Sequence, residues 1–139
     1  MGYSTAMVQA VSILLFIHFK SEEGLFDFLS TKTIAEMLNI PAPTAVKVLY
    51  KLNSAGLTYA KEGAKGGFLL AKPISEITFL EVFNAVEKGK PLFKMQHNFN
   101  IEYENLDFIK ERGLRFLMDA EEAMKASLEK VTISDILKK

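Results

Sequence analysis

The chain contains no cysteine among its 139 residues. This absence excludes disulfide bonds, thiolate metal sites, a cysteine nucleophile and iron–sulfur clusters held by cysteine ligands. Long apolar runs are missing too, since the longest, Val11 to Phe19, is interrupted by Ser12 and His18 and is far too short to cross a bilayer. No basic start followed by a cleavage site marks a secretory signal. We therefore expect a cytoplasmic protein with no membrane partner.

Net charge is also lacking, because 17 basic and 17 acidic side chains give a formal charge of zero. A balanced chain is not, as a whole, a strongly basic nucleic-acid binder. The charge is nonetheless uneven: residues 41–72 carry five lysines against Glu62 alone, a net +4, whereas residues 1–40 and 73–139 each carry −2. The length fits one domain, and a hydrophobic content of 49% is enough for one ordinary core.

Apolar residues at helical spacing predict a mainly α-helical chain. A first amphipathic helix is expected at about residues 4–20, followed by a short apolar strand at residues 25–29. Ser30 is placed to cap a second helix that runs to Leu38. An asparagine and two prolines then interrupt the pattern, and Pro43 in a first-turn position restarts it.

The third predicted helix has one apolar and one polar face, and it is expected to end near Gly56. Its inward face consists of Ala45, Val48, Leu49 and Leu52. Its outward face consists of Thr44, Lys47, Lys51 and Ser54. Two short helices joined by a tight turn, the second with a polar and basic face, are typical of a helix-turn-helix.

A hairpin is predicted directly after this helix. The stretch EGAKGGFLLAKP, residues 62–73, holds three glycines and two lysines. The segments on either side of its glycine-rich part, residues 57–61 and 67–71, are strand-like. A β-hairpin that follows a recognition helix is the wing of a winged helix.

The residue types in this hairpin suit a phosphate backbone as partner. Glycines let the chain turn tightly and approach closely, while Lys61 and Lys65 would neutralise phosphates. A nucleotide-binding P-loop fits worse, because that motif opens a helix with Gly-Lys-Ser/Thr, whereas Gly66 and Gly67 open a strand here. The hairpin alone would fit a solvated loop equally well. The helix-turn-helix before it favours the wing.

The segment GGFLLAKPISEITFLEVFNAVEKG resembles the part of the sequence by which the Rrf-two family of bacterial winged-helix regulators is known. That family has a Gly-Gly-aromatic-x-Leu-Ala wing, followed by Ile-Thr-Leu-x-Asp-Val and Val-Glu. The likeness extends back through KLNSAGL and IAEMLNI and forward to VTISDIL, so it covers nearly the whole chain. It implies a homodimeric transcription factor that binds operator DNA through the recognition helix and the wing.

The chain departs from the family pattern at several positions. Glu62-Gly63 stands where many members have an Arg-Gly pair entering the wing tip. Val46 precedes Lys47 where polar residues often follow the start of the recognition helix. Cluster-bearing members carry three cysteines before the long helix, whereas the matching segment KPLFKMQHNFNIEYEN contains none. We therefore expect no iron–sulfur sensor.

Other candidate ligands in that segment are weaker. His97 has Met95, Glu102 and Glu104 nearby in sequence, but one histidine without a second at ligand spacing is more often a surface or packing residue. His18, at the end of an apolar stripe, is expected to be structural. Four aromatic residues could line an effector pocket or pack the winged helix against the long helix: Phe93, Phe99, Tyr103 and Phe108.

Two helices are predicted after the wing. Thr78 and Glu81 form a capping box for the first. Residues 105–131 suit one long helix with a near-heptad seam at Leu106, Ile109, Gly113, Phe116, Leu117, Ala120, Ala123, Met124, Ser127, Leu128 and Val131. Every seventh residue from Gly113 is small, which lets another helix come close. The seam could instead cover the chain's own core, but the family resemblance favours a dimer interface.

These observations together predict a mainly α fold with a small β-hairpin wing. Residues 1–88 would form the winged helix-turn-helix, 89–104 a connecting segment, and 105–139 a dimerisation helix with a tail that packs on the winged helix. DNA contacts are expected from Ser30, Thr31, Lys32, Thr44, Lys47, Lys51, Lys61, Lys65, Gly66 and Gly67. Dimer contacts are expected from Leu106, Ile109, Gly113, Phe116, Leu117, Ala120, Met124 and Ser127.

The expected function is that of a dimeric repressor of transcription, which binds double-stranded DNA without a cofactor. The scheme leaves room for an unidentified small molecule or protein as effector. No nucleophile elbow, zinc-protease pair or dinucleotide fingerprint indicates an enzyme. The alternative is a winged helix that serves protein interaction or small-molecule sensing and whose DNA face has decayed, because Glu62 would repel phosphates.

Overall fold

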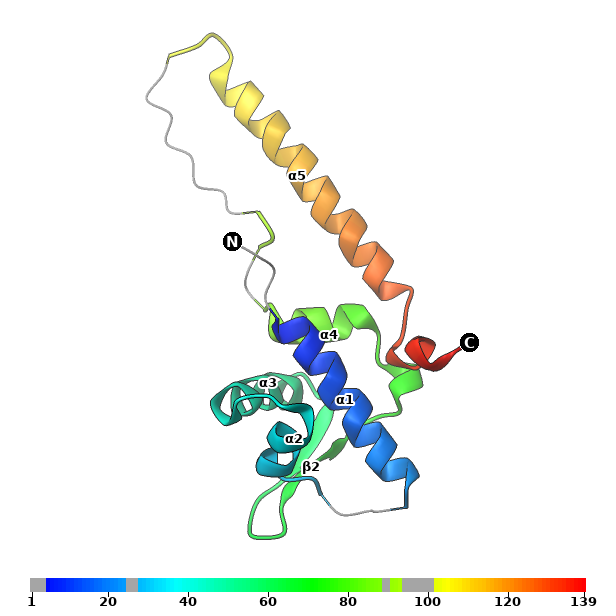
Figure 1. The fold of residues 1–139 in the computed structure, drawn as a ribbon. Coiled ribbons are helices and arrows are strands. Elements are labelled where there is room, and N and C mark those ends of the chain that lie inside the picture. The colour runs from blue at the N-terminus through cyan, green and yellow to red at the C-terminus, as the bar shows by residue number, and fades with distance from the viewer. Residues whose placement is uncertain (1–4, 25–27, 89–90, 94–101) are drawn as a thin grey trace.

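The computed structural model describes residues 5–24, 28–88, 91–93 and 102–139. Its helices are α1 (Ala6–Glu22), α2 (Thr31–Leu38), α3 (Ala42–Ser54), α4 (Phe79–Val86) and α5 (Leu106–Glu129). Two strands, β1 (Thr58–Lys61) and β2 (Gly67–Leu70), form the hairpin, and short 3-10 turns lie at η1 (Ile74–Glu76) and η2 (Ile133–Leu137). Figure 1 shows the first four helices and the hairpin packed together, with α5 extending away from them. The predicted mainly α fold with a hairpin wing is confirmed.

The core forms around α1. Ala10, Ile13, Leu14 and Ile17 recur on one face of this helix and are almost completely buried. They pack in one cluster with apolar residues of α2, α3, the turns and α4, namely Ile34, Val48, Leu49, Leu52, Leu57, Ile74, Ile77, Val82, Ala85, Val86 and Ile133. Burial of this face orients the outer faces of α2 and α3 toward solvent.

Local signals in the sequence set the ends of α2 and α3. The Ser30 side chain accepts a hydrogen bond from the Thr33 backbone N–H at 3.1 Å, which is the predicted cap. Asn39 ends α2 in the left-handed conformation, with φ of 54°. α3 then begins after Pro41, with Pro43 in its first turn as expected. The turn between the helices is therefore short, as a helix-turn-helix requires.

The hairpin pairs its strands in antiparallel register, from Thr58 opposite Leu70 to Lys61 opposite Gly67. β1 starts one residue later than expected because the Leu57 N–H donates back to the Leu52 carbonyl at the end of α3, at 3.0 Å. Of the strand expected at residues 25–29, the first three positions lie outside the described residues.

The last residue of the strand expected at residues 25–29 pairs with the hairpin through an isolated antiparallel bridge. Leu29 forms a bridge to Phe68, with N–H to carbonyl distances of 3.1 and 2.8 Å in the two directions. Leu29 immediately precedes the capping residue of α2. The start of α2 is therefore held against β2.

The C-terminal tail returns to the start of α4. Phe79 N–H donates to the Val131 carbonyl and Ile133 N–H to the Ile77 carbonyl, both at 2.9 Å, and Ile133 is fully buried. The predicted capping box is confirmed: the Thr78 side chain accepts from Glu81 N–H at 3.1 Å, and the Glu81 carboxylate accepts from Thr78 N–H at 3.2 Å. The start of α4 is thus held both by its capping box and by the C-terminal tail.

α5 differs from the other helices because none of its residues is buried. It spans residues 106–129 rather than the expected 105–131, and three residues of its expected seam are half-buried: Leu106, Met124 and Leu128. Among the described residues, no helix is long and apolar enough to cross a membrane.

Candidate nucleic-acid interface

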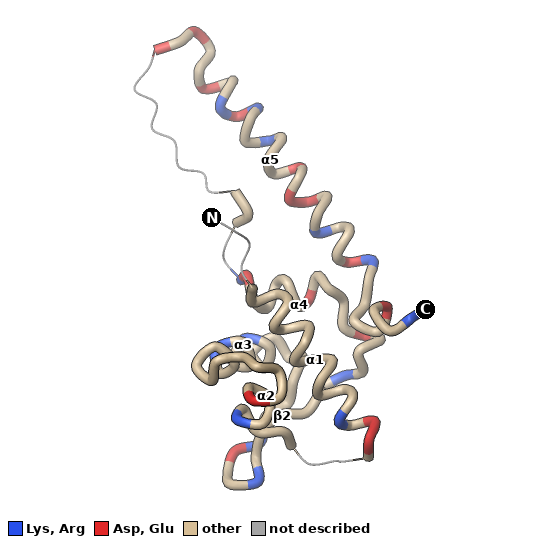
Figure 2. Tube along the Cα trace, in the orientation of Figure 1, with Lys and Arg blue, Asp and Glu red and all other residues tan. Residues whose placement is uncertain are grey.

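Three elements of the winged helix carry the residues predicted to contact DNA: α3, the start of α2 and the hairpin. Figure 2 shows lysine positions on each of them, with isolated acidic positions in between. The bridge between Leu29 and Phe68 holds the start of α2 beside the hairpin. The contacts within the helix-turn-helix hold α2 against α3.

The exposed ridge of α3 differs partly from the predicted outward face. Ala45, Val48, Leu49 and Leu52 are buried as expected. Each residue of an α-helix is rotated by about 100° from the one before it. The side of α3 directly opposite the buried residues therefore carries four residues, spaced three or four positions apart: Pro43, Lys47, Tyr50 and Ser54. All four are exposed, whereas Thr44 and Lys51 lie to one side and are half-buried.

Sequence reasoning therefore missed Tyr50, whose side chain is 73% exposed, and treated Val46, 55% exposed, only as a departure from the family pattern. The spacing of three residues from Lys47 to Tyr50 is the signal that would have found it, because residues three apart share a helix face. Tyr50 offers both an aromatic ring and a hydroxyl at this surface.

Lys51 is engaged within the protein. Its ammonium group donates a hydrogen bond to the Val86 carbonyl, at 3.2 Å, and the side chain is half-buried. Val86 is the last residue of α4, whose final carbonyls have no partner within the helix. Lys51 thus ties the recognition helix to the end of α4, and its predicted contact with DNA stays a prediction.

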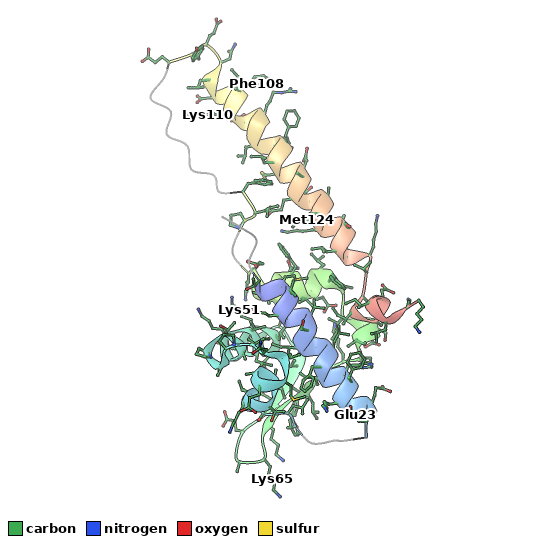
Figure 3. All side chains as sticks on the ribbon, in the orientation of Figure 1. Glu23, Lys51, Lys65, Phe108, Lys110 and Met124 are labelled. Carbon is green, nitrogen blue, oxygen red and sulfur yellow. The ribbon has the colours of Figure 1, made fainter. Side chains whose placement is uncertain are left out.

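The tip of the hairpin is built by close backbone contacts. The Gly66 N–H donates to the Gly63 carbonyl at 3.0 Å, and a side chain at Gly66 would overlap the Lys61 carbonyl. A side chain at Gly67 would overlap the Leu29 backbone. These glycines let the loop turn and approach α2, and they leave Lys65 exposed at the tip (Figure 3).

Lys61 lies at the base of the tip. Its ammonium nitrogen is 5.6 Å from the centroid of the Phe28 ring, which in turn lies 5.9 Å from the ring of Tyr59. Such a cation–π contact restrains the lysine while its charge remains in solvent. Glu62, next to it, is exposed as well.

The start of α2 is a second candidate for backbone contacts. The first N–H groups of a helix have no partner within it and carry a partial positive charge, so they favour phosphate oxygens. The Ser30 side chain already accepts a hydrogen bond from the Thr33 N–H. Thr31 is half-buried, and Lys32 is exposed. Of these three residues, only Lys32 is therefore exposed.

The residues predicted for dimer contact lie along α5 in two groups. Leu106 and Met124 are half-buried. The others are exposed, namely Ile109, Gly113, Phe116, Leu117, Ala120 and Ser127. Phe116 also takes part in a stack: the Arg112 guanidinium lies 5.6 Å from the Phe108 ring and 5.5 Å from the Phe116 ring. An apolar and aromatic surface thus faces solvent along α5.

The donor set does not fit a cysteine-ligated iron–sulfur cluster, because the chain has no cysteine. Within residues 5–24, 28–88, 91–93 and 102–139, no three histidine, aspartate or glutamate side chains gather to hold a metal ion. His97, Met95 and Phe99 lie outside the described residues. Of the other aromatic candidates, Tyr103 and Phe108 are exposed and Phe93 is half-buried.

Curated proteins similar to this chain are named as regulators of transcription. YwgB of Bacillus subtilis, named as an HTH-type transcriptional regulator, is 36% identical over 87 residues, which cover 63% of this chain and 54% of that protein. The similarly named slr0846 of Synechocystis is 39% identical over 60 residues, or 43% of this chain and 41% of that protein. The chain thus matches only about half of these curated relatives or less.

Solved structures share the fold at low sequence identity. CymR of B. subtilis, the global cysteine regulator, is 23% identical with a TM-score of 0.64, over 98% of this chain and 95% of that one. T. potens IscR is 19% identical with a TM-score of 0.62, over 99% of this chain and 86% of that one. A transcriptional-regulator structure from Lactobacillus plantarum reaches 0.79 at 14% identity, over 96% of this chain and 87% of that one.

A family model covers nearly the whole chain. The model for Rrf2, described as an iron-dependent transcriptional regulator, matches residues 3–139. The resemblance read from the wing and the segment after it is therefore confirmed. The chain belongs to the Rrf2 family of transcriptional regulators, and it has the winged-helix fold of that family.

Proposed function

We propose that this chain is a homodimeric DNA-binding repressor, which reads a palindromic operator with α3 and the wing and works without a cysteine-ligated cluster. The observation that carries the proposal is the exposed ridge of α3, with Lys47 and Tyr50, on the same winged helix as the exposed tip lysine Lys65. Family membership supports it, because the matched model describes transcriptional regulators.

The position and chemistry of each residue indicate whether it would contact bases or phosphates. Lys47 and Tyr50 project from the side of α3 opposite the core, so they are the side chains best able to reach base edges in a major groove. Lys65 and Lys32 are exposed point charges on the loop tip and at the start of α2, and they suit phosphates on either side of that groove. Phosphate contacts of this kind fix position, and base contacts fix sequence.

Dimerisation through α5 completes the proposal. A helix with no buried residue and with Phe116, Leu117 and Ile109 all more than 40% exposed has apolar surface that a second copy would cover. Two protomers about a two-fold axis would place two α3 helices in successive major grooves. The operator would then be a palindrome with half-sites roughly 10 base pairs apart.

Variants at the DNA face test the proposal once genomic fragments bound by the protein have been selected. Lys65→Glu should weaken binding to operator and random duplex alike, because it replaces a phosphate contact that is blind to sequence. Lys47→Ala should mainly reduce the preference for operator over mutated operator, by about 1–3 kcal/mol. Lys139→Glu, a charge change of the same size at the exposed C-terminus, is the control and should change neither.

A second function is favoured by one feature of the same surface. Glu62 places an exposed carboxylate in the wing, and Val46 and Tyr50 give α3 an apolar character. A winged helix that binds a protein, or that senses a small molecule, would have such a face. Glu62→Arg separates the readings: it should strengthen DNA binding if the wing meets phosphates, and a face that has lost DNA would not respond.

A further inference from the structure

A cleft lies between α3 and α4. Of the residues assigned above to DNA, Lys51 and Tyr50 line it, and none of the predicted dimer contacts does. Its volume is about 640 Å³, within the range of about 300–1,000 Å³ that is usual for small-molecule sites. It is lined by the second half of α3 and by α4 with the turn that follows: Tyr50, Lys51, Ser54, Ala55, Glu81, Asn84, Ala85, Val86 and Lys88.

Five of the side chains that line this cleft carry hydrogen-bond donors. Two lysines, two hydroxyls and an amide line it, from Lys51, Lys88, Tyr50, Ser54 and Asn84. The lysines come from different elements, one from the middle of α3 and one from just beyond α4. A site with this composition favours a ligand that carries negative charge and accepts hydrogen bonds.

Glu81 is the acidic residue in this lining, and its charge is already compensated. Its carboxylate lies 2.6 Å from the Lys72 ammonium, and it also accepts the Thr78 N–H at 3.2 Å. Burial opposes ionisation, but the Lys72 and Thr78 hydrogen bonds outweigh it and hold the pKa of Glu81 below its ordinary value. The carboxylate thus stays ionised and paired with Lys72 at neutral pH, and among the described residues neither Lys51 nor Lys88 forms an ion pair.

Lys51 can serve both the protein and a ligand. An ammonium group has three N–H donors, and the Val86 carbonyl takes one of them. This contact restrains the half-buried side chain, which lines the cleft. A restrained lysine loses less conformational entropy on binding than a free one, so the contact prepares it for an anion.

We propose that the cleft between α3 and α4 binds a small oxyanion, a carboxylate or phosphate compound, with its charge met by Lys51 and Lys88. The apolar parts of the cleft, from Ala55, Ala85 and Val86, would contact the carbon skeleton of such a compound. Because Lys51 belongs to the recognition helix, a bound anion would bridge that helix to α4 and change DNA affinity. This last consequence rests on the proposed function, whereas the binding itself does not.

The test is a titration of the full isotope-labelled chain, without DNA, followed by the chemical shifts of its backbone amides. Inorganic phosphate, pyrophosphate and citrate are the probes, and glycerol is the neutral control. We expect saturable binding of at least one anion with Kd about 1 mM or tighter, with shifts that cluster in the second half of α3 and in α4. Shifts that cluster elsewhere, or no saturation, would overturn the proposal.

Matched lysine variants locate the charge. Lys88 is exposed, so Lys88→Gln keeps the fold and should weaken binding about tenfold or more. Lys51→Gln should do the same, and its thermal melting curve reports any loss of structure. Lys65→Gln, in the wing, should leave binding unchanged, and an equal loss there would assign the anion to the surface at large. Because the titration contains no DNA, a failure to bind anions would not count against the proposed function. Likewise, a failure to bind DNA would not count against anion binding in the cleft.

Discussion

Gly113 in the middle of α5 gives the sharpest test of the dimer, because substitution there should act in opposite directions on the monomer and on the dimer. A β-carbon added at Gly113 meets no atom within 4 Å in the single chain. Glycine costs a helix interior about 0.8–1 kcal/mol relative to alanine, so Gly113→Leu should stabilise α5 in an isolated protomer. In a close helix pair, the added volume should instead weaken association by about 1–3 kcal/mol, or roughly 5- to 150-fold in the dimer dissociation constant.

Sedimentation equilibrium measures the association, and circular dichroism at low concentration measures the stability of α5. We expect Gly113→Leu to shift the population toward monomer while helix content is kept or increased. Glu122→Leu is the matched control, since it adds a leucine at an exposed position on the opposite side of α5 from the seam. A wild-type monomer, an unchanged Gly113→Leu dimer, or equal weakening by Glu122→Leu would refute the assignment of the interface.

Three further predictions concern the winged helix and use urea unfolding as the measurement. Ser30→Ala should lower the free energy of unfolding by about 1 kcal/mol because it removes the cap of α2; an unchanged midpoint would show that the hydroxyl contributes nothing. Gly67→Ala should destabilise more than Gly63→Ala, since both positions have positive φ but only the former would push against the Leu29 backbone; equal losses would refute the collision. Because folding lowers the pKa of Glu81, its ionised carboxylate stabilises the fold at pH values above the ordinary pKa of about 4.3. This stabilisation is lost as the pH falls through the lower pKa of the folded state. Glu81→Gln should therefore destabilise the protein at pH 7 and make little difference near pH 3, and an equal effect at both would contradict this linkage.

The helices and the hairpin were predictable because their signals are local. Ser30 and Pro43 indicate where α2 and α3 begin, and the capping box of Thr78 and Glu81 indicates the start of α4. The buried face of α3 followed from its spacing alone. These features depend on residues within a few positions of one another, so a single sequence carries them.

The contacts that were not predicted join segments far apart in the chain. Nothing near Lys51 in sequence indicates that its ammonium group binds the carbonyl of Val86, 35 residues later. The pairing of Val131 and Ile133 with the start of α4 is equally non-local. The exposed ridge of α3 was missed in part for another reason: ranking outward residues by polarity placed Thr44 and Lys51 ahead of Tyr50, although the geometry of the buried face favours Tyr50.

The salt dependence of DNA binding tests the central claim most directly. The assay is fluorescence anisotropy of the full chain on a duplex taken from its selected genomic fragments, as potassium chloride rises from about 50 to 200 mM. If Lys65 and Lys32 of two protomers each meet a phosphate, about four counterions are released, and affinity should fall roughly 150-fold with a log–log slope near −3.6. Absence of binding at the lowest salt, or an affinity that does not change across the range, would contradict the account of this winged helix as a DNA-binding regulator.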